Sequence, residues 1–125
     1  GGGLAAQSDD DWDWLQTMIV GTLRNTTRAF LPAVAASPAG VFAIVSQNGV
    51  AKPTAGNANY LAAKAAAETW LLAVGDALKK GPGRVHIERV MALYSDADVA
   101  ADPERDFSRH TRVRDLGRTL AGLFG

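Results

Sequence analysis

The sequence contains no cysteine, which excludes disulfide bonds and metal sites built on thiolates. This absence also fits a reducing compartment, and we therefore expect a cytoplasmic protein. Histidine is scarce as well, with only His86 and His110 in the chain. Neither lies at a spacing that would pair it with another ligand, so we expect no metal site.

Neither sign of charge predominates, and the chain has no long hydrophobic run. Thirteen lysines and arginines balance thirteen aspartates and glutamates, so neither nucleic acid nor an anionic membrane surface is an expected partner. The most apolar stretch, residues 29–46, is interrupted by Pro32, Pro38 and Gly40. A membrane-spanning helix needs about 20 mostly apolar residues, so we expect no membrane span.

What the chain does contain is typical of one small globular domain. Its 125 residues allow one core, and 47% hydrophobic with 21% charged residues are the proportions of a folded protein. Hydrophobic periodicity, capping residues and glycine–proline breaks predict helices and strands in alternation. The expected order is helix 8–34, strand 41–46, helix 59–80, strand 84–90, a polar irregular stretch 94–110, and a helix from Thr111, as its cap, to residue 123.

The order of these elements predicts an α/β fold. The run VFAIVS (41–46) is continuously apolar, as expected of a parallel strand that is buried on both faces, and a helix between two strands is the usual parallel crossover. Two strands do not make a stable sheet of this kind, so we expect the other strands of the domain to lie elsewhere. The chain opens on GGG without an initiator methionine, which indicates a fragment, a processed product or the ordered part of a longer protein.

Tyr60 and Lys64 form the first candidate pair, at positions i and i+4 of the predicted helix 59–80. Residues at this spacing share one face of a helix. A lysine ammonium near a phenol favours the phenolate and lowers a tyrosine pKa that is about 10 when unperturbed. The phenol can then act as a general acid or base near neutral pH. The alternative interpretation is an ordinary exposed pair on a surface helix.

Three sequence patterns place this pair in a wider context. DDWDWLQTMIVGTLRNTTRAFLPA (10–33) precedes IVSQNG (44–49), a predicted strand that ends in Ser46, and NANYLAAKAAAE (57–68) follows. Together they resemble the C-terminal half of a short-chain dehydrogenase/reductase, in which a W-D helix, a strand ending in I-S-S-x-x-G and a Y-x-x-x-K helix follow one another. The resemblance covers about residues 12–90. It implies part of a Rossmann-like, doubly wound parallel sheet.

The resemblance implies an NAD(P)-dependent oxidoreductase that transfers hydride between a nicotinamide and a carbonyl or alcohol substrate. Tyr60 would exchange a proton with the substrate oxygen, while Lys64 would hold the nicotinamide ribose and lower the pKa of the tyrosine. Ser46 would hydrogen-bond the substrate oxygen and the tyrosine. NAD or NADP would be the cofactor, because the cofactor carries the redox chemistry and the protein supplies the geometry.

Three features of this region depart from the family pattern. The strand end selects Ser46 as the family's serine, whereas the usual spacing to the tyrosine selects Gln47. We favour Ser46, because loop length varies more easily than a strand end. Ile19 occupies the position of an asparagine that supports the lysine through a water, and Ala92 and Leu93 replace a proline–glycine turn beneath the nicotinamide.

The strand, glycine-rich turn and helix that bind pyrophosphate in this fold are not found in the sequence. The opening glycines resemble instead the turn after the family's fourth strand, and Gly2 would line the adenosine side of the cofactor. We therefore expect 1–125 to be a single partial domain that lacks the N-terminal dinucleotide-binding half and is inactive by itself. Residues 94–110 occupy the place of the family's variable substrate loop, so we expect them to be mobile.

Alanines at 62, 63 and 65–67 surround the candidate pair. Alanine is the best helix former, and small residues also let helices approach closely. The resemblance implies that this helix and the preceding one pack against their symmetry mates in a dimer or tetramer. Two hypotheses follow: an oxidoreductase acting on a small carbonyl or alcohol substrate, or a degenerate family member that serves as a non-catalytic subunit of a homo-oligomer or of a heteromer with an active homologue.

Overall fold

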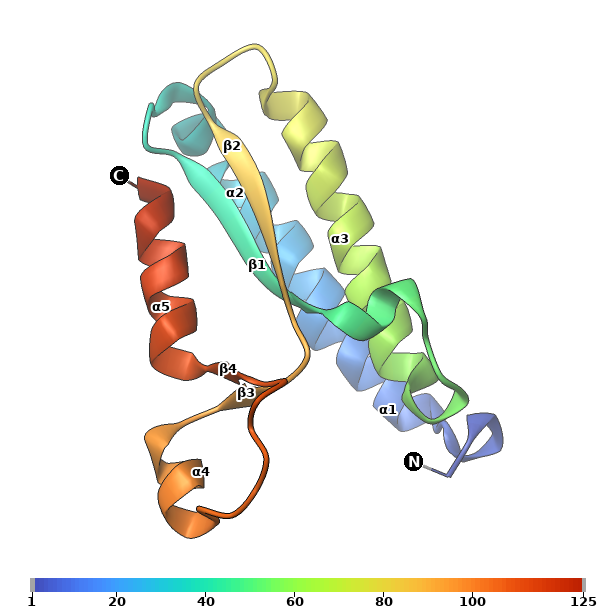
Figure 1. Ribbon diagram of the computed structural model, residues 1–125. Helices are drawn as coiled ribbons and strands as arrows, with labels where there is room; N and C mark the ends of the chain where they lie inside the picture. The colour runs from blue at the N-terminus through green and yellow to red at the C-terminus, as the bar shows by residue number, and fades with distance from the viewer. Residues whose placement is uncertain (1, 125) are drawn as a thin grey trace.

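The computed structural model describes residues 2–124 (Figure 1). Two long helical stretches lie on one side of a pair of parallel strands, and a smaller C-terminal part first continues beyond the carboxyl ends of these strands and then turns back, so that the last helix lies beside them. The helices are α1 (Asp9–Leu15), α2 (Thr22–Ala36), α3 (Ala58–Leu78), α4 (Asp96–Ala101) and α5 (Val113–Ala121), and the strands are β1 (Val41–Gln47), β2 (Arg84–Val90), β3 (Leu93–Tyr94) and β4 (Thr111–Arg112).

The first helical stretch covers residues 9–36, as the apolar periodicity predicts. Ser8 begins it, because its hydroxyl accepts a hydrogen bond from the backbone N–H of Asp11 at 3.1 Å. Between α1 and α2 the backbone widens into a π-helical segment, η2 (Gln16–Gly21), which the apolar periodicity does not predict. Such segments occur frequently at functional sites, and this one carries Ile19.

β1 and β2 pair in parallel over their whole length, from Val41 opposite Arg84 to Gln47 opposite Val90. α3 makes the crossover between them. Both strands and the helix confirm elements that the sequence predicts. Because the two strands run in the same direction, their carboxyl ends meet at one edge of the pair, at Gln47 and Val90.

The core lies between α3 and the face of the strands that α3 covers. Leu71, Val74 and Leu78 of α3 are buried at its centre. The partly buried side chains that pack around them are Leu23, Leu31, Val34, Ala35, Phe42, Ile44, Trp70, Val85 and Ile87. On β1 most side chains are only half-buried, and Ala43 is exposed. The prediction that β1 is buried on both faces is therefore wrong within residues 2–124, because α2 and α3 lie on the same side of the strands (Figure 1).

Residues 94–110 are not wholly irregular, contrary to the prediction. Ser95 begins α4 with a capping box: its hydroxyl accepts from the N–H of Asp98 at 3.2 Å, and the Asp98 carboxylate accepts from the N–H of Ser95 at 2.7 Å. The prediction that Thr111 caps the last helix is wrong. Thr111 instead pairs with Leu93 in the short parallel pair β3–β4. α5 begins without a side-chain cap.

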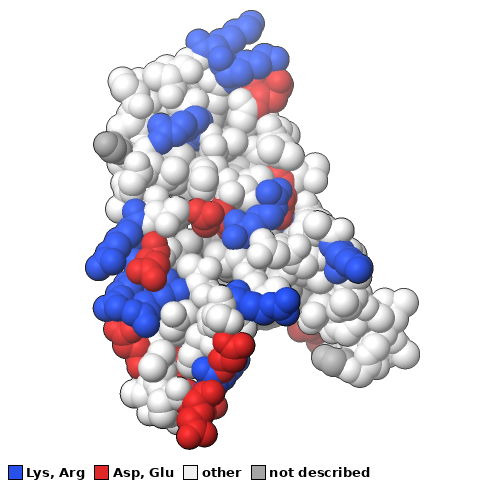
Figure 2. Space-filling view, in the orientation of Figure 1, with Lys and Arg blue, Asp and Glu red and all other residues white. Residues whose placement is uncertain are grey.

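These elements confirm the predicted α/β class, with parallel strands joined by a crossover helix. Lysine and arginine side chains are interleaved with aspartate and glutamate on the face shown in Figure 2, rather than gathered in one basic patch. No helix within residues 2–124 is long and apolar enough to cross a membrane.

Candidate functional site

A hollow of about 340 Å³ lies at the carboxyl ends of β1 and β2, beside the first half of α3. The predicted pair, Tyr60 and Lys64, lines this strand-end hollow together with both alternatives for the serine position. Its full lining is Val45, Ser46, Gln47, Tyr60, Lys64, Val90, Met91, Ala92 and Leu93. Folding thus brings residues that are far apart in the sequence to one place at the end of the parallel strands.

Lys64 reaches from α3 to the end of β1. Its ammonium donates a hydrogen bond to the Val45 carbonyl, with 3.0 Å between Nζ and O. Nζ also lies 5.7 Å from the centroid of the Tyr60 ring, within the range of a cation–π contact. Burial lowers the pKa of Lys64, and the nearby charge of Glu68 partly offsets that effect. An ammonium has several N–H donors, so the bond to Val45 leaves others available to a ligand.

Tyr60 lies at the rim of the strand-end hollow, with 37% of its surface exposed. Burial of the rest raises the pKa of its phenol above the ordinary value of 10.0. This direction is opposite to the lowering expected from a neighbouring ammonium. The reason is geometric, because the Lys64 ammonium bonds the Val45 carbonyl and faces the ring of Tyr60.

Ser46 also lines the hollow, but it is only 2% exposed and its hydroxyl is already paired. It donates to the carboxylate of Glu68, with 2.6 Å between Oγ and Oε2. Glu68 lies on α3 and is itself 6% exposed. Its other oxygen accepts hydrogen bonds from Arg89 of β2, from Nε at 3.0 Å and also from Nη2. The hydroxyl predicted to bind a substrate oxygen is therefore held in a buried polar network.

Glu68 is a residue of this site that is not among the residues predicted from the sequence. Burial by itself would raise the pKa of its carboxyl group. Hydrogen bonds from Arg89 and Ser46, together with the charge of Lys64, outweigh this effect, so the pKa lies below its ordinary value. Spacing is the signal that could have found it, because Tyr60, Lys64 and Glu68 recur at every fourth residue and share one face of α3.

Gln47, the alternative at the serine position, joins the two strand ends across the hollow. Its amide Nε2 donates to the carbonyl of Met91 at 3.0 Å, and its Oε1 accepts from the backbone N–H of Gly49. Gln47 is less buried than Ser46 and is the last residue of β1. Of the two alternatives, Gln47 lies at the rim of the hollow, and Ser46 lies on its buried side.

The other departures from the family pattern lie close to the pair. Ile19 lines a second hollow, of about 330 Å³, together with Lys64. Its apolar side chain offers the ammonium no hydrogen bond. Ala92 and Leu93 line the strand-end hollow itself, and neither has the backbone freedom of glycine. The pair therefore lacks the polar support that the resemblance implies for Lys64.

Gly2 and Gly3 lie near the end of α3 that carries Tyr60. Gly2 and Gly3 have φ angles of +82° and +75°, which L side chains rarely adopt, so this turn requires glycine. Gln7 ties the segment to α3: its amide donates to the carbonyl of Gly56 at 3.1 Å and accepts from the N–H of Asn59 at 2.9 Å. Gly2 is thus placed at the same end of the molecule as the candidate pair.

A nicotinamide nucleotide needs one site for its nicotinamide and ribose and a second site for its pyrophosphate. The strand-end hollow offers the ammonium of Lys64 and the side chain of Tyr60, which are groups that can hydrogen-bond hydroxyls such as those of a ribose. The Gly2–Gly3 turn is followed by a 3-10 helix of only three residues, η1 (Leu4–Ala6), which is too short to offer the helix N-terminus on which pyrophosphate is bound in this fold. Residues 2–124 contain no cluster of histidine, aspartate and glutamate that could hold a metal ion.

Comparison of the chain with models of protein families, with curated proteins and with solved structures gives no match. A proposal of function therefore depends on the geometry of the strand-end hollow.

Proposed function

We propose that this chain carries the tyrosine–lysine half of an NAD(P)-dependent oxidoreductase of the short-chain dehydrogenase/reductase type, within a Rossmann-like parallel sheet. One observation supports this proposal above the others: Tyr60 and Lys64 lie on one face of the crossover helix and line a hollow at the carboxyl ends of two parallel strands. Ligands of open parallel α/β sheets bind at that end of the strands.

Each residue has a role that its surroundings allow. Tyr60, half exposed at the rim, exchanges a proton with the oxygen of a small carbonyl or alcohol substrate. Lys64 is held by the Val45 carbonyl, and its remaining donors bind the ribose hydroxyls. The cofactor, NAD or NADP, supplies the hydride chemistry. Gly2 lines its adenosine side.

Ser46 and Gln47 divide the role of the family's serine in this proposal. The Ser46 hydroxyl donates to Glu68, and Ser46 is almost fully buried. Ser46 therefore stabilises the end of β1 and does not bind the substrate itself. The Gln47 amide lies at the rim, and its nitrogen has a second N–H that can donate to a substrate oxygen while the first holds the Met91 carbonyl. Exchange of Gln47 for alanine is expected to weaken substrate turnover if Gln47 is the donor, and unchanged turnover would exclude Gln47 from this role.

Titration with NADH and with NADPH, followed by nicotinamide fluorescence, tests the proposal in the protein expressed from its complete gene. Binding is expected, and Lys64→Met weakens it. Tyr60→Phe leaves binding intact and lowers reduction of a panel of aldehydes and ketones by about 10²-fold or more, because the acid/base group is lost. Tyr94→Phe is the matched control, since Tyr94 is the other tyrosine of the chain and stacks on Phe107 instead. Failure of both nucleotides to bind would refute the oxidoreductase proposal.

A second candidate function is a non-catalytic subunit of a homo-oligomer or of a heteromer with an active homologue. Three observations favour it: the Ser46 hydroxyl is paired with Glu68, Ile19 gives Lys64 no polar support, and burial raises the pKa of Tyr60. Co-purification with an active homologue is the expected result for such a subunit. A protein that is active alone as a homodimer would exclude it.

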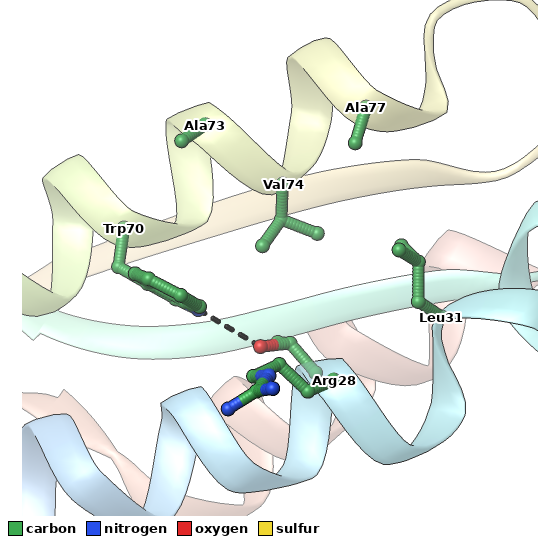
Figure 3. Close-up of a pocket in the computed structure, with 7 residues that line it drawn as sticks. Arg28, Leu31, Trp70, Ala73, Val74 and Ala77 are labelled. Atoms are coloured by element: carbon green, nitrogen blue, oxygen red, sulfur yellow. Dashed lines mark hydrogen bonds between the residues drawn. The ribbon is translucent and has the colours of Figure 1, made fainter.

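Both candidate functions involve a partner, and we propose a second copy of this chain on the outer face of α2 and α3. An apolar groove of about 220 Å³ runs between these helices, and Figure 3 shows Trp70 and Val74 of α3 pointing toward α2, which contributes Arg28 and Leu31. The dashed line marks the bond from Trp70 Nε1 to the hydroxyl of Thr27, at 2.8 Å. α3 is apolar nearly all round, which is typical of a helix that is covered on every side.

Sedimentation velocity tests this dimer. Ala73→Glu places a longer, charged side chain in the groove and is expected to give monomers, because it would occupy the space that a second copy must fill and would take a charge out of water. Ala101→Glu makes the same change at an exposed position of α4 and is expected to leave the dimer intact. A monomeric wild-type protein would overturn the assignment of a second copy.

A further inference from the structure

Glu68 is the most buried acidic group in the described chain, at 6% exposure. A buried carboxylate is costly unless it is paired and hydrogen-bonded, and replacing a buried ion pair with apolar residues often leaves stability unchanged or improved. Stability alone therefore gives no reason for an acid at this position among the alanines of α3. Its contacts point to a different role.

The carboxylate of Glu68 spans the two parallel strands. Ser46 of β1 and Arg89 of β2 lie directly opposite each other in the strand register. Ser46 donates to Oε2 at 2.6 Å, and Arg89 donates to Oε1 through Nε at 3.0 Å. One side chain of the crossover helix thus holds both strands one residue before their carboxyl ends.

Successive turns of α3 hold successive residues of β1. Lys64 donates to the carbonyl of Val45, and Glu68 accepts from the hydroxyl of Ser46, the next residue along the strand. Together these bonds fix how α3 is placed along β1 where the strand-end hollow forms. Loss of either bond would let the rim residue Gln47 shift relative to α3.

We propose that Glu68 is a positioning residue: its carboxylate joins the ends of β1 and β2 to α3 and keeps Lys64 in place as a charged ammonium at the strand-end hollow. The consequence for catalysis rests on the function proposed above, but the action of Glu68 on Lys64 does not. Glu68 is not among the residues that line the hollow, and it affects Lys64 through its charge, so it acts through that charge and through the strand ends.

The charged and titratable groups around Lys64 determine how its pKa responds to a substitution. α3 contributes Tyr60 and Glu68, and β2 contributes Arg89, which bonds Glu68. β1 contributes the uncharged carbonyl of Val45. The π-helical segment η2, which lines the neighbouring hollow, brings only uncharged side chains toward Lys64. Glu68 is therefore the acidic group that opposes the effect of burial on Lys64.

The test is an NMR titration of the Lys64 side chain, followed through its ¹³Cε signal. The chain has four lysines, and loss of one signal in Lys64→Met assigns it. In Glu68→Gln the titration midpoint of Lys64 is expected to move to lower pH, because the negative charge is removed while the shape and an acceptor for Ser46 remain. Ser46→Ala leaves both charges in place, and its midpoint is expected to stay near the wild-type value. Glu104→Gln, a change at an exposed residue, is the control.

Arg89→Gln makes the proposal testable even where Glu68→Gln fails to fold. Arg89 has a half-exposed side chain, and its removal frees the Glu68 carboxylate from a competing cation. The Lys64 midpoint is then expected to move to higher pH, the opposite direction. An unchanged midpoint in a folded variant of either kind would overturn the proposal. A shifted midpoint in a protein that binds no nicotinamide nucleotide would leave the positioning role standing and refute the proposed function alone.

Discussion

Truncation of Leu71 to alanine is expected to remove a large part of the stability of this fold. Leu71 is 0% exposed and lies at the centre of the core between α3 and the strands, with Val74 and Leu78 beside it. Burying a leucine side chain contributes about 1.5–3 kcal/mol through removal of its surface from water. The cavity left by truncation adds to this loss, and measured costs of such substitutions lie at about 2–5 kcal/mol.

The neighbouring residue supplies a matched control. Leu72 is 61% exposed, so Leu72→Ala makes the same chemical change in the same helix, one position along. Helix propensity changes equally in both variants and cancels in the comparison. In a monomeric sample Leu72→Ala is expected to change the free energy of unfolding by no more than about 0.5 kcal/mol.

Urea unfolding followed by far-ultraviolet circular dichroism measures both variants. With a slope of about 1.5 kcal/mol/M, a loss of about 3 kcal/mol in Leu71→Ala lowers the midpoint by about 2 M. The slope itself is expected to stay the same, because the same surface is exposed on unfolding. Equal midpoints for the two variants would show that α3 does not pack on the strands through Leu71, and the described core would then be wrong.

Three further predictions concern the caps and polar contacts. Ser8→Ala removes the N-cap of α1 and is expected to lower the free energy of unfolding by about 1 kcal/mol in urea denaturation; no loss would mean that the cap contributes nothing to stability. Thr27→Val leaves the indole N–H of Trp70 without its acceptor and is expected to cost about 1–3 kcal/mol, with a change in tryptophan fluorescence of the folded state; an unchanged spectrum and midpoint would contradict this contact. The pKa of Glu68 is below its ordinary value of 4.5, so the unfolded chain takes up this proton first and stability is lost as the pH falls below about 4.5. A pH series of urea midpoints checks this, and Glu68→Gln is expected to flatten the loss; an identical acid profile in that variant would contradict it.

Local structure follows closely from local sequence in this chain. The apolar stripe of the first helical stretch, the apolar run of β1 and the alternation of β2 each predict an element at the position where it forms. The N-cap at Ser8 is likewise a short-range contact, between residues three apart. Errors occur where short-range signals are weak or compete, as in the capping box of Ser95 within a stretch that reads as polar and irregular.

The candidate site was likewise predictable in part from the sequence. Spacing on one helix puts Tyr60 and Lys64 on a common face, and this much was predictable from residues four apart. That Lys64 bonds the Val45 carbonyl instead of the phenol, and that burial raises the pKa of Tyr60, depends on how α3 lies against β1. No periodicity in the sequence specifies that placement.

The sequence by itself therefore determined the order and type of the main elements and the pairing of Tyr60 with Lys64, because these depend on neighbours along the chain. Only the tertiary structure decided the role of Ser46, whose hydroxyl is bound to a carboxylate 22 residues away. It also revealed Glu68, which joins Ser46 to Arg89 across the two strands. The physical reason is that such contacts form only after packing has set the register between α3, β1 and β2.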